Sequence, residues 1–171
     1  MKRKYYNVPG HFHYLTFSCY HRKQLPIDPI ICHWLAENID LSRSIEHFYL
    51  YSYVFMPEHV HLLIRPTDEE YSMSRIMRRI KEPFTRRVVE SWKLNSPMKL
   101  GQLQAKFGSR IVYRFWQPGG GYDRNLFDME KIKSAIEYIE FNPVRRGLVT
   151  DPIDWEWFSS RARNGYKDIP L

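Results

Sequence analysis

Two apolar segments joined by a short turn, within residues 47–66, constrain the fold more than any other part of the sequence. They read "HFYLYSYVFM" (47–56) and "HVHLLIRP" (59–66), and both are rich in the aromatic and β-branched residues that favour strands. Only Pro57 and Glu58 separate them, so the chain has to reverse in a tight turn. The sequence therefore predicts an antiparallel hairpin.

Further strands and helices flank this hairpin. The segments "FHYLTFSC" (12–19) and "IVYRFWQ" (111–117) have the composition of strands. Apolar residues at helical spacing, each set preceded by a capping side chain, predict helices over 28–44, 72–92 and 129–142. Short connections between neighbouring strands then favour an α+β fold of the ferredoxin-like (split βαβ) kind, an antiparallel sheet with helices packed on it.

The length of 171 residues suits one domain with a substantial core, so we expect a single unit over 1–171. Within it, residues 93–110 have weak periodicity and several turn formers, which predicts a mostly irregular excursion with room for one helical turn. The segment "PGGGYDRN" (118–125) is predicted to be a flexible connector, either a hinge or a plain linker. Residues 161–171 are expected to form a tail.

The charge of the chain favours a polyanionic partner. Lys and Arg outnumber Asp and Glu by 26 to 19, a formal net charge of +7, so nucleic acid is the first candidate. Seven arginines lie off the apolar stripe of helix 72–92 or just after the last helix, where they could follow phosphates: Arg75, Arg78, Arg79, Arg86, Arg87, Arg145 and Arg146. Each one alone could equally be a solvated surface charge.

The sequence also indicates a compartment. No uncharged apolar run reaches the length of about 18 residues that a membrane span requires. The basic N-terminus is not followed by the apolar region of a secretory signal. Only Cys19 and Cys32 are present, which fits a reducing environment. We therefore expect a cytoplasmic protein that does not enter a membrane.

Two histidines interrupt the second strand of the hairpin. Because strand side chains alternate between faces, His59 and His61 lie on the same face, and their rings can converge on one cation. Unpaired imidazoles among Val, Leu and Ile would be costly to desolvate, so they need a partner. A divalent metal ion is one such partner. Two imidazoles that are simply hydrogen-bonded near the surface remain the alternative.

The last helix places a tyrosine and an asparagine one turn apart. Tyr138 and Asn142, in the segment "YIEFNPVRRGLV", fall at i and i+4 beside the apolar stripe, so they can act at one place. A phenol oxygen is a competent nucleophile when its target is activated, and an amide oxygen suits Mg²⁺ or Mn²⁺. The alternative is a tyrosine whose ring packs and whose hydroxyl binds water.

Together, "MPEHVHLLI" and "YIEFNPVRRGLV" resemble the motifs of the single-tyrosine HUH transposases, and most closely those of the REP-associated tyrosine transposases. Further likeness comes from "KYYNVPGHFHYLTFSC", "IMRRIKEPFTRRV", "FWQ" and "DWEWFSS", so that it spans most of the chain to about residue 160. Two positions depart from the pattern: Glu58 stands where many relatives have Asn, and Asn142 where insertion-sequence relatives often have Gln. The segment 93–110 matches no part of it.

The resemblance implies an HUH endonuclease fold and an activity. Tyr138 would be the nucleophile, and His59, His61 and Asn142 would hold Mg²⁺ or Mn²⁺. The expected reaction is cleavage of single-stranded or hairpin DNA at a repeat or transposon end, through a 5′-phosphotyrosine with a free 3′-OH, followed by strand transfer. Some relatives act as dimers and some REP-associated members as monomers, so a monomer is expected and a homodimer stays open.

Two other classes of protein fit the same residues. A metal-dependent nuclease would activate water at the histidines and use Tyr138 only structurally. A DNA-binding regulator would keep the basic surface without turnover, although the presence of the tyrosine and both histidines argues against that class.

Overall fold

The computed structural model describes residues 6–25, 28–163 and 171, and a four-stranded antiparallel sheet forms its centre. The sheet has the order β2–β3–β1–β6 and consists of β1 (Phe12–Ser18), β2 (Phe48–Met56), β3 (His59–Pro66) and β6 (Tyr122–Leu126). The predicted hairpin is confirmed, since β2 and β3 pair from Met56↔His59 to Phe48↔Pro66. Strand β1 pairs antiparallel with both β3 and β6.

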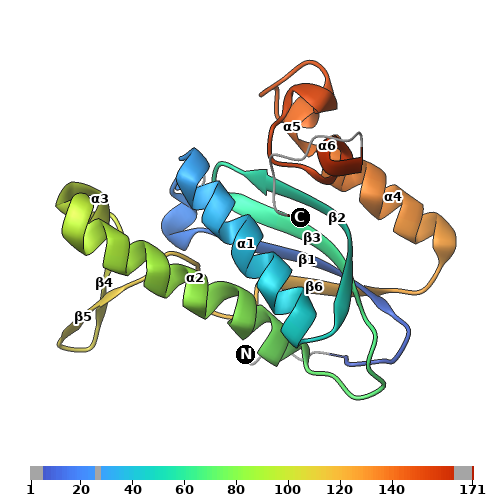
Figure 1. Ribbon diagram of the computed structural model, residues 1–171, viewed down its shortest axis with the longest axis horizontal. Coiled ribbons are helices and arrows are strands. Elements are labelled where there is room, and N and C mark those ends of the chain that lie inside the picture. The colour runs from blue at the N-terminus through green and yellow to red at the C-terminus, as the bar shows by residue number, and fades with distance from the viewer. Residues whose placement is uncertain (1–5, 26–27, 164–170) are drawn as a thin grey trace.

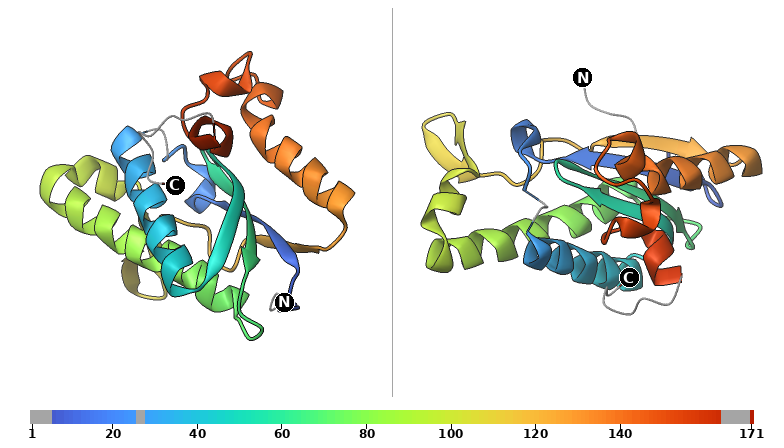
Figure 2. Two further views of the ribbon diagram at one scale, coloured as in Figure 1. Left: turned by 45° about the vertical axis from the view of Figure 1, so that its right-hand side comes forward. Right: turned by 90° about the horizontal axis from the view of Figure 1, so that it is seen from above.

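Helices α1 (Pro29–Ile45) and α2 (Met73–Asn95) cover one face of the sheet, where they lie side by side (Figures 1 and 2). The predicted caps form, because the side chain of Asp28 accepts a hydrogen bond from the Ile30 amide and that of Ser72 accepts one from Arg75. Helix α2 continues across Pro83 without a break. Its predicted apolar stripe is buried in a core that also takes Leu15, Phe17, Val60, Leu62 and Ile64 from the strands.

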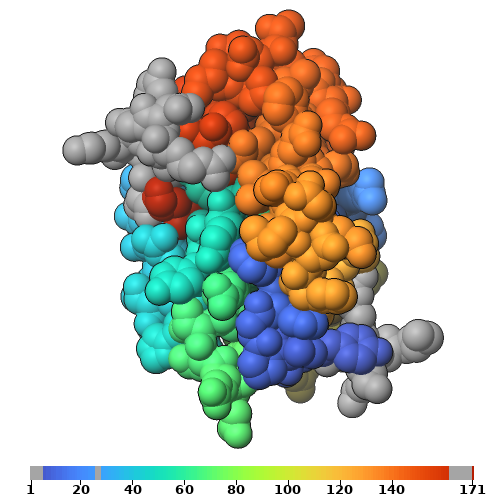
Figure 3. All heavy atoms as spheres, turned by 90° about the vertical axis from the view of Figure 1, so that its right-hand side faces the viewer, coloured from blue at the N-terminus to red at the C-terminus, as the bar shows by residue number. Residues whose placement is uncertain are grey.

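A smaller core lies on the other face of the sheet, under α4 (Met129–Glu140). It contains Val54, Met56, Leu63, Leu126, Ile132, Ile139 and Phe158. Helix α6 (Ser159–Arg163) packs on β2 near it, and the short elements α5 (Asn142–Arg145) and η2 (Pro152–Asp154) connect α4 to α6. Figure 3 shows this side of the molecule, where residues of the N-terminal strand, the β2–β3 hairpin and the region around α4 meet although they are far apart in sequence.

Two expectations about connecting segments are wrong. Residues 93–110 are not mostly irregular, since they contain the end of α2, then α3 (Pro97–Gly101) and β4 (Gln104–Phe107), which pairs with β5 (Arg110–Tyr113) in a separate two-stranded sheet. The fourth strand of the main sheet is therefore β6 rather than residues 111–117. Strand β6 takes up residues 122–125 of the segment 118–125, which the sequence predicts to be a flexible connector.

The physical reason is that β6 is an edge strand with little apolar signal. Only Leu126 is buried among its residues, and its backbone is held by pairing with β1 rather than by its own side chains. A short helix, η1 (Tyr20–Arg22), follows β1. Residues 164–170 of the expected tail lie outside the described residues. No helix in the part of the chain that the structure describes is long and apolar enough to cross a membrane.

Candidate active site

The two histidines of β3 face the α4 side of the sheet. Val60, Leu62 and Ile64 point into the core under α1 and α2, so alternation sends His59 and His61 to the opposite face. The Nε2 atoms of the two rings lie 2.9 Å apart, with the ring planes at 87°. Both imidazoles therefore present the same nitrogen to one point.

Two side chains of strand β1 form hydrogen bonds with His61. The register pairs Thr16 with His61, and the Nδ1 atom of His61 lies 2.8 Å from Thr16 Oγ1 and 2.9 Å from the Tyr14 hydroxyl. Burial, with a smaller contribution from His59, lowers the pKa of His61 to about 3. The ring is thus neutral, and in the tautomer that carries the proton on Nδ1 these hydroxyls accept it, which leaves the Nε2 lone pair free to bind a metal ion.

Glu58 links His59 to Arg146, which lies at the end of α5. Its Oε1 atom lies 3.2 Å from His59 Nδ1 and accepts a hydrogen bond of 2.7 Å from Arg146. Although burial raises the pKa of Glu58, the hydrogen bond from Arg146 and the positive charges around it bring the pKa below its usual value. The carboxylate can therefore orient His59 so that Nε2 faces His61.

Tyr138 of α4 lies beside this histidine pair. Its ring centroid is 5.8 Å from that of His61, at an interplanar angle of 88°, and 5.0 Å from the guanidinium carbon of Arg145. The residue is 41% exposed, so a substrate can approach it from solvent. It borders a cavity of about 540 Å³ between α4 and the sheet, lined by Tyr14, Thr16, His61, Tyr122, Arg124, Leu126, Lys131, Ser134 and Ala135.

Asn142 lies at the start of α5 and is 5% exposed. Its Nδ2 atom is 3.3 Å from His61 Nε2, whereas its Oδ1 atom is buried without a hydrogen-bond partner within the described residues. Rotating the amide by half a turn would direct that oxygen to the histidine pair. Two imidazole nitrogens and an amide oxygen that has no hydrogen-bond partner form a set of ligands that a divalent cation can bind.

The spacing of the nitrogens fits an ion as well. Two nitrogen ligands about 2.1 Å from one ion and at right angles to each other lie about 3.0 Å apart. The separation of 2.9 Å between the two Nε2 atoms agrees with that figure. Among the residues described, no group of three His, Cys, Asp or Glu side chains could hold a metal ion, so an ion here would rely on Asn142 or on ligands that the chain does not supply.

The seven predicted arginines divide into three groups. Arg145 and Arg146 lie at the site, as described above. Arg75 and Arg79 both bind the buried carboxylate of Glu46, and Arg87 pairs with Glu37, so these three brace α2 against α1. Arg78 and Arg86 line a separate cavity beside α2.

Sequence reasoning overlooked Tyr14, Thr16 and the role of Glu58. Tyr14 and Thr16 alternate with Leu15 and Phe17, which are buried in the core under α1 and α2, so the period of β1 assigns them to the other face. Their meeting with His61 depends on the pairing of β1 with β3, and these strands are separated by a connection of forty residues (19–58). That pairing leaves no signal in the local sequence.

Comparisons with known proteins agree with this arrangement. A family model described as "Transposase IS200 like" matches residues 9–141. The chain is similar to the solved structure of a REP-associated tyrosine transposase bound to a REP hairpin, with a TM-score of 0.75 and 20% sequence identity over 97% of this chain and 86% of that chain. This likeness confirms the expected α+β fold.

A second solved structure, a candidate transposase from Deinococcus radiodurans R1, matches with a TM-score of 0.49 and 18% identity over 79% of this chain and 95% of that chain. No curated protein matches the chain.

Proposed function

The chain belongs to the IS200-like transposase family, and we propose that it cuts and rejoins single-stranded DNA through a covalent bond to Tyr138. One observation carries this proposal: a solvent-accessible tyrosine on α4 and a histidine pair on β3, 77 residues apart between Tyr138 and His61, meet with ring centroids 5.8 Å apart. Membership of the family supports DNA transposition and a tyrosine transposase as the class of enzyme.

In the proposed reaction, the Tyr138 oxygen attacks the scissile phosphorus and the 3′-oxygen of the preceding nucleotide leaves. The phenol loses its proton, and the departing oxygen gains one, so that a 3′-OH and a 5′-phosphotyrosine result. The phosphoester is retained in the new bond. A second 3′-OH can therefore reverse the step and join another strand without an external energy source.

The positive side chains around Tyr138 suit this chemistry. The guanidinium carbon of Arg145 lies 5.0 Å from the centroid of the tyrosine ring, where its charge attracts the phosphate. Arg124 and Lys131 line the same cavity and can bind the flanking phosphates. Thr16 and Tyr14 hold the tautomer of His61, and Glu58 orients His59.

We further propose that His59, His61 and Asn142 hold Mg²⁺ or Mn²⁺. Such an ion supplies a Lewis acid that polarises a phosphate oxygen. The unpartnered Oδ1 atom of Asn142 and the facing Nε2 atoms support this assignment. Asn is one methylene shorter than Gln. Asn142, the first residue of α5, nevertheless places its Nδ2 atom 3.3 Å from His61 Nε2.

The proposed substrate is DNA that folds into a hairpin, because the similar solved structure is described as bound to a REP hairpin. The tyrosine and both histidines approach one another within one chain, which supports a subunit that acts with its own tyrosine. A monomer is therefore sufficient for the reaction, and a homodimer is not required to complete the site.

The test is a search for the covalent product. Single-stranded oligonucleotides with imperfect palindromes, labelled at the 3′ end, are incubated with the protein and Mg²⁺ or Mn²⁺ and separated on a denaturing gel. We expect a labelled protein–DNA adduct from the native chain and none from Tyr138→Phe. Tyr122→Phe is the matched control, since Tyr122 lines the same cavity and is 44% exposed.

Two results would contradict the proposal. An adduct that persists in Tyr138→Phe removes the nucleophile assignment. Cleavage to free 5′-phosphate products, equal in the native chain and in Tyr138→Phe, would instead identify a nuclease that uses water.

A further inference from the structure

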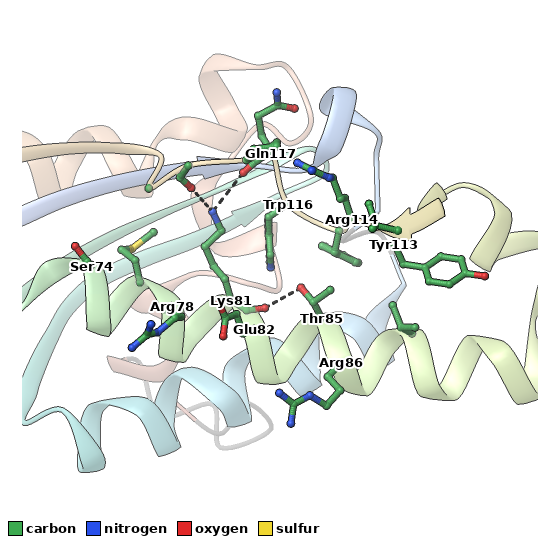
Figure 4. A pocket seen from close by; sticks show the side chains of 17 residues that line it. Ser74, Arg78, Lys81, Glu82, Thr85, Arg86, Tyr113, Arg114, Trp116 and Gln117 are labelled. Carbon is green, nitrogen blue, oxygen red and sulfur yellow. Dashed lines mark hydrogen bonds between the residues drawn. The ribbon is translucent and has the colours of Figure 1, made fainter. Parts of the chain in front are cut away.

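A second and larger cavity lies on the other side of the sheet from Tyr138, between α2 and the chain at 112–120 (Figure 4). Its volume is about 820 Å³. The proposed reaction does not use it. Met77 and Trp116, which line it, belong to the core under α1 and α2, whereas the cavity at Tyr138 opens on the α4 side.

The lining combines aromatic and apolar walls with positive charges. Tyr113, Trp116 and Val89 supply flat or apolar surface, and Arg78, Lys81, Arg86 and Arg114 supply four cations. Surfaces that join aromatic side chains to a basic groove are typical of sites for unpaired nucleic acid, since bases stack and phosphates bind the cations.

Lys81 is placed within this cavity by the connector that follows Trp116. Its Nζ atom donates a hydrogen bond of 2.9 Å to the Gly119 carbonyl and lies 5.6 Å from the Phe17 ring centroid. Burial lowers the pKa of Lys81 to about 8. A phosphate that enters the cavity would therefore meet a partly buried cation.

The arginines of α2 show which side of the helix is available to a ligand. Arg79 and Arg87 face α1 and form ion pairs with Glu46 and Glu37. Arg78 and Arg86 line the cavity, and within the described part of the chain neither forms an ion pair or a hydrogen bond. With Arg75, which also pairs with Glu46, this helix carries three braced arginines and two whose charges are unused in the fold.

The same connector borders both cavities. Residues 117–120 line the cavity beside α2, and Tyr122 lines the cavity at Tyr138. Between them, Gly121 lies against β1 so closely that an added Cβ atom would come within 2.4 Å of the Thr16 carbonyl oxygen. Residues 117–122 therefore contribute to the lining of both cavities.

We infer that the cavity beside α2 is a second DNA site, which receives unpaired nucleotides of the strand that is cut at Tyr138; this inference rests on the proposed function. Arg78 and Arg86 bind the phosphates, and a base lies against the aromatic wall.

Salt-dependent binding tests this inference in a Tyr138→Phe background, where cleavage cannot interfere. A fluorescent oligonucleotide with an unpaired segment next to a hairpin is titrated at several salt concentrations. We expect the double variant Arg78→Gln/Arg86→Gln to lose affinity and to reduce the slope of log K against log salt by about 1.4, or about 0.7 for each lost phosphate contact. The matched control, Arg79→Gln/Arg87→Gln, removes the same charge from the other side of α2 and should leave the slope nearly unchanged.

Photo-cross-linking tests where the unpaired segment of the oligonucleotide lies on the protein. An oligonucleotide with 5-iododeoxyuridine in its unpaired segment should cross-link to a peptide that contains Tyr113 or Trp116. Equal slopes in the two double variants, together with cross-links confined to the cavity at Tyr138, would overturn the second site. That result is independent of adduct formation by the native chain, so failure of the inference and failure of the proposed function are distinguishable.

Discussion

The ion pair between Glu58 and Arg146 couples the histidine strand to the chain after the tyrosine helix, and its removal gives a measurable loss of stability. Arg146 donates a hydrogen bond of 2.7 Å to Glu58, whose side chain is 9% exposed, whereas the Arg146 side chain is 50% exposed. A hydrogen bond to a charged group contributes about 1.5–3 kcal/mol, and solvent around the arginine places this one at the lower end. We therefore expect Arg146→Ala to lower the free energy of unfolding by about 1.5 kcal/mol.

The assay is urea denaturation at pH 7 of the native chain, Arg146→Ala, Glu58→Gln and the double variant. If the pair interacts directly, the double variant should lose about 1 kcal/mol less than the sum of the single losses. Arg145→Ala is the control, because Arg145 contacts the exposed ring of Tyr138 instead of a buried carboxylate. Its effect should stay within about 0.5 kcal/mol.

The pH dependence supplies an independent check. The pKa of Glu58 is lowered in the folded state, so its stabilising effect is present above the unfolded value of 4.5 and is lost as the pH falls below it. In Arg146→Ala the largest lowering interaction is gone and burial favours the protonated acid. The difference between the two proteins should thus be largest near neutral pH and shrink in acid. Strictly additive losses at pH 7, or a difference that grows in acid, would refute this account.

Three further outcomes are expected from urea denaturation. Ile139→Ala, at a fully buried position under α4, should cost about 2–4 kcal/mol, whereas Met129→Ala at an exposed position of the same helix should cost less than about 0.5 kcal/mol. Gly121→Ala should destabilise more than Gly119→Ala, because both have positive φ but only the first would bring a Cβ atom into the backbone of β1. Lys81→Met should be more stable than the native chain below pH 8, by about 1 kcal/mol. The gain should vanish between pH 8 and 10.5, because the lysine of the native chain loses its proton first in the folded state and then in the unfolded state.

Local periodicity predicts those elements whose own side chains are buried. The hairpin of β2 and β3 and helices α1, α2 and α4 all bury an apolar face, and the structure confirms them. Strand β6 could not be found in this way. Its residues Tyr122–Leu126 are mostly polar, and the strand exists because β1 presents unpaired backbone groups to it.

The same distinction applies to the candidate site. Alternation along β3 is enough to put His59 and His61 on one face. Helical spacing predicts that Tyr138 and Asn142 lie close together, but α4 ends at Glu140 and Asn142 begins α5. Neither pattern relates the strand to the helix. Their meeting depends on the small core under α4, where Ile139 packs with Val54 and Leu63.

The packing of this small core also determines the geometry of the site. A shift of β3 by one residue would turn His61 toward α1 and α2 and move Leu62 to the side of α4, because strand faces alternate. A shift of α4 by one residue would rotate Tyr138 by about 100° away from His61. Because Ile139 and Leu63 would be exposed or misplaced by such shifts, the burial that stabilises this face also fixes the tyrosine beside the histidines. Substitutions that loosen the small core should therefore reduce adduct formation even where they touch none of the proposed catalytic groups.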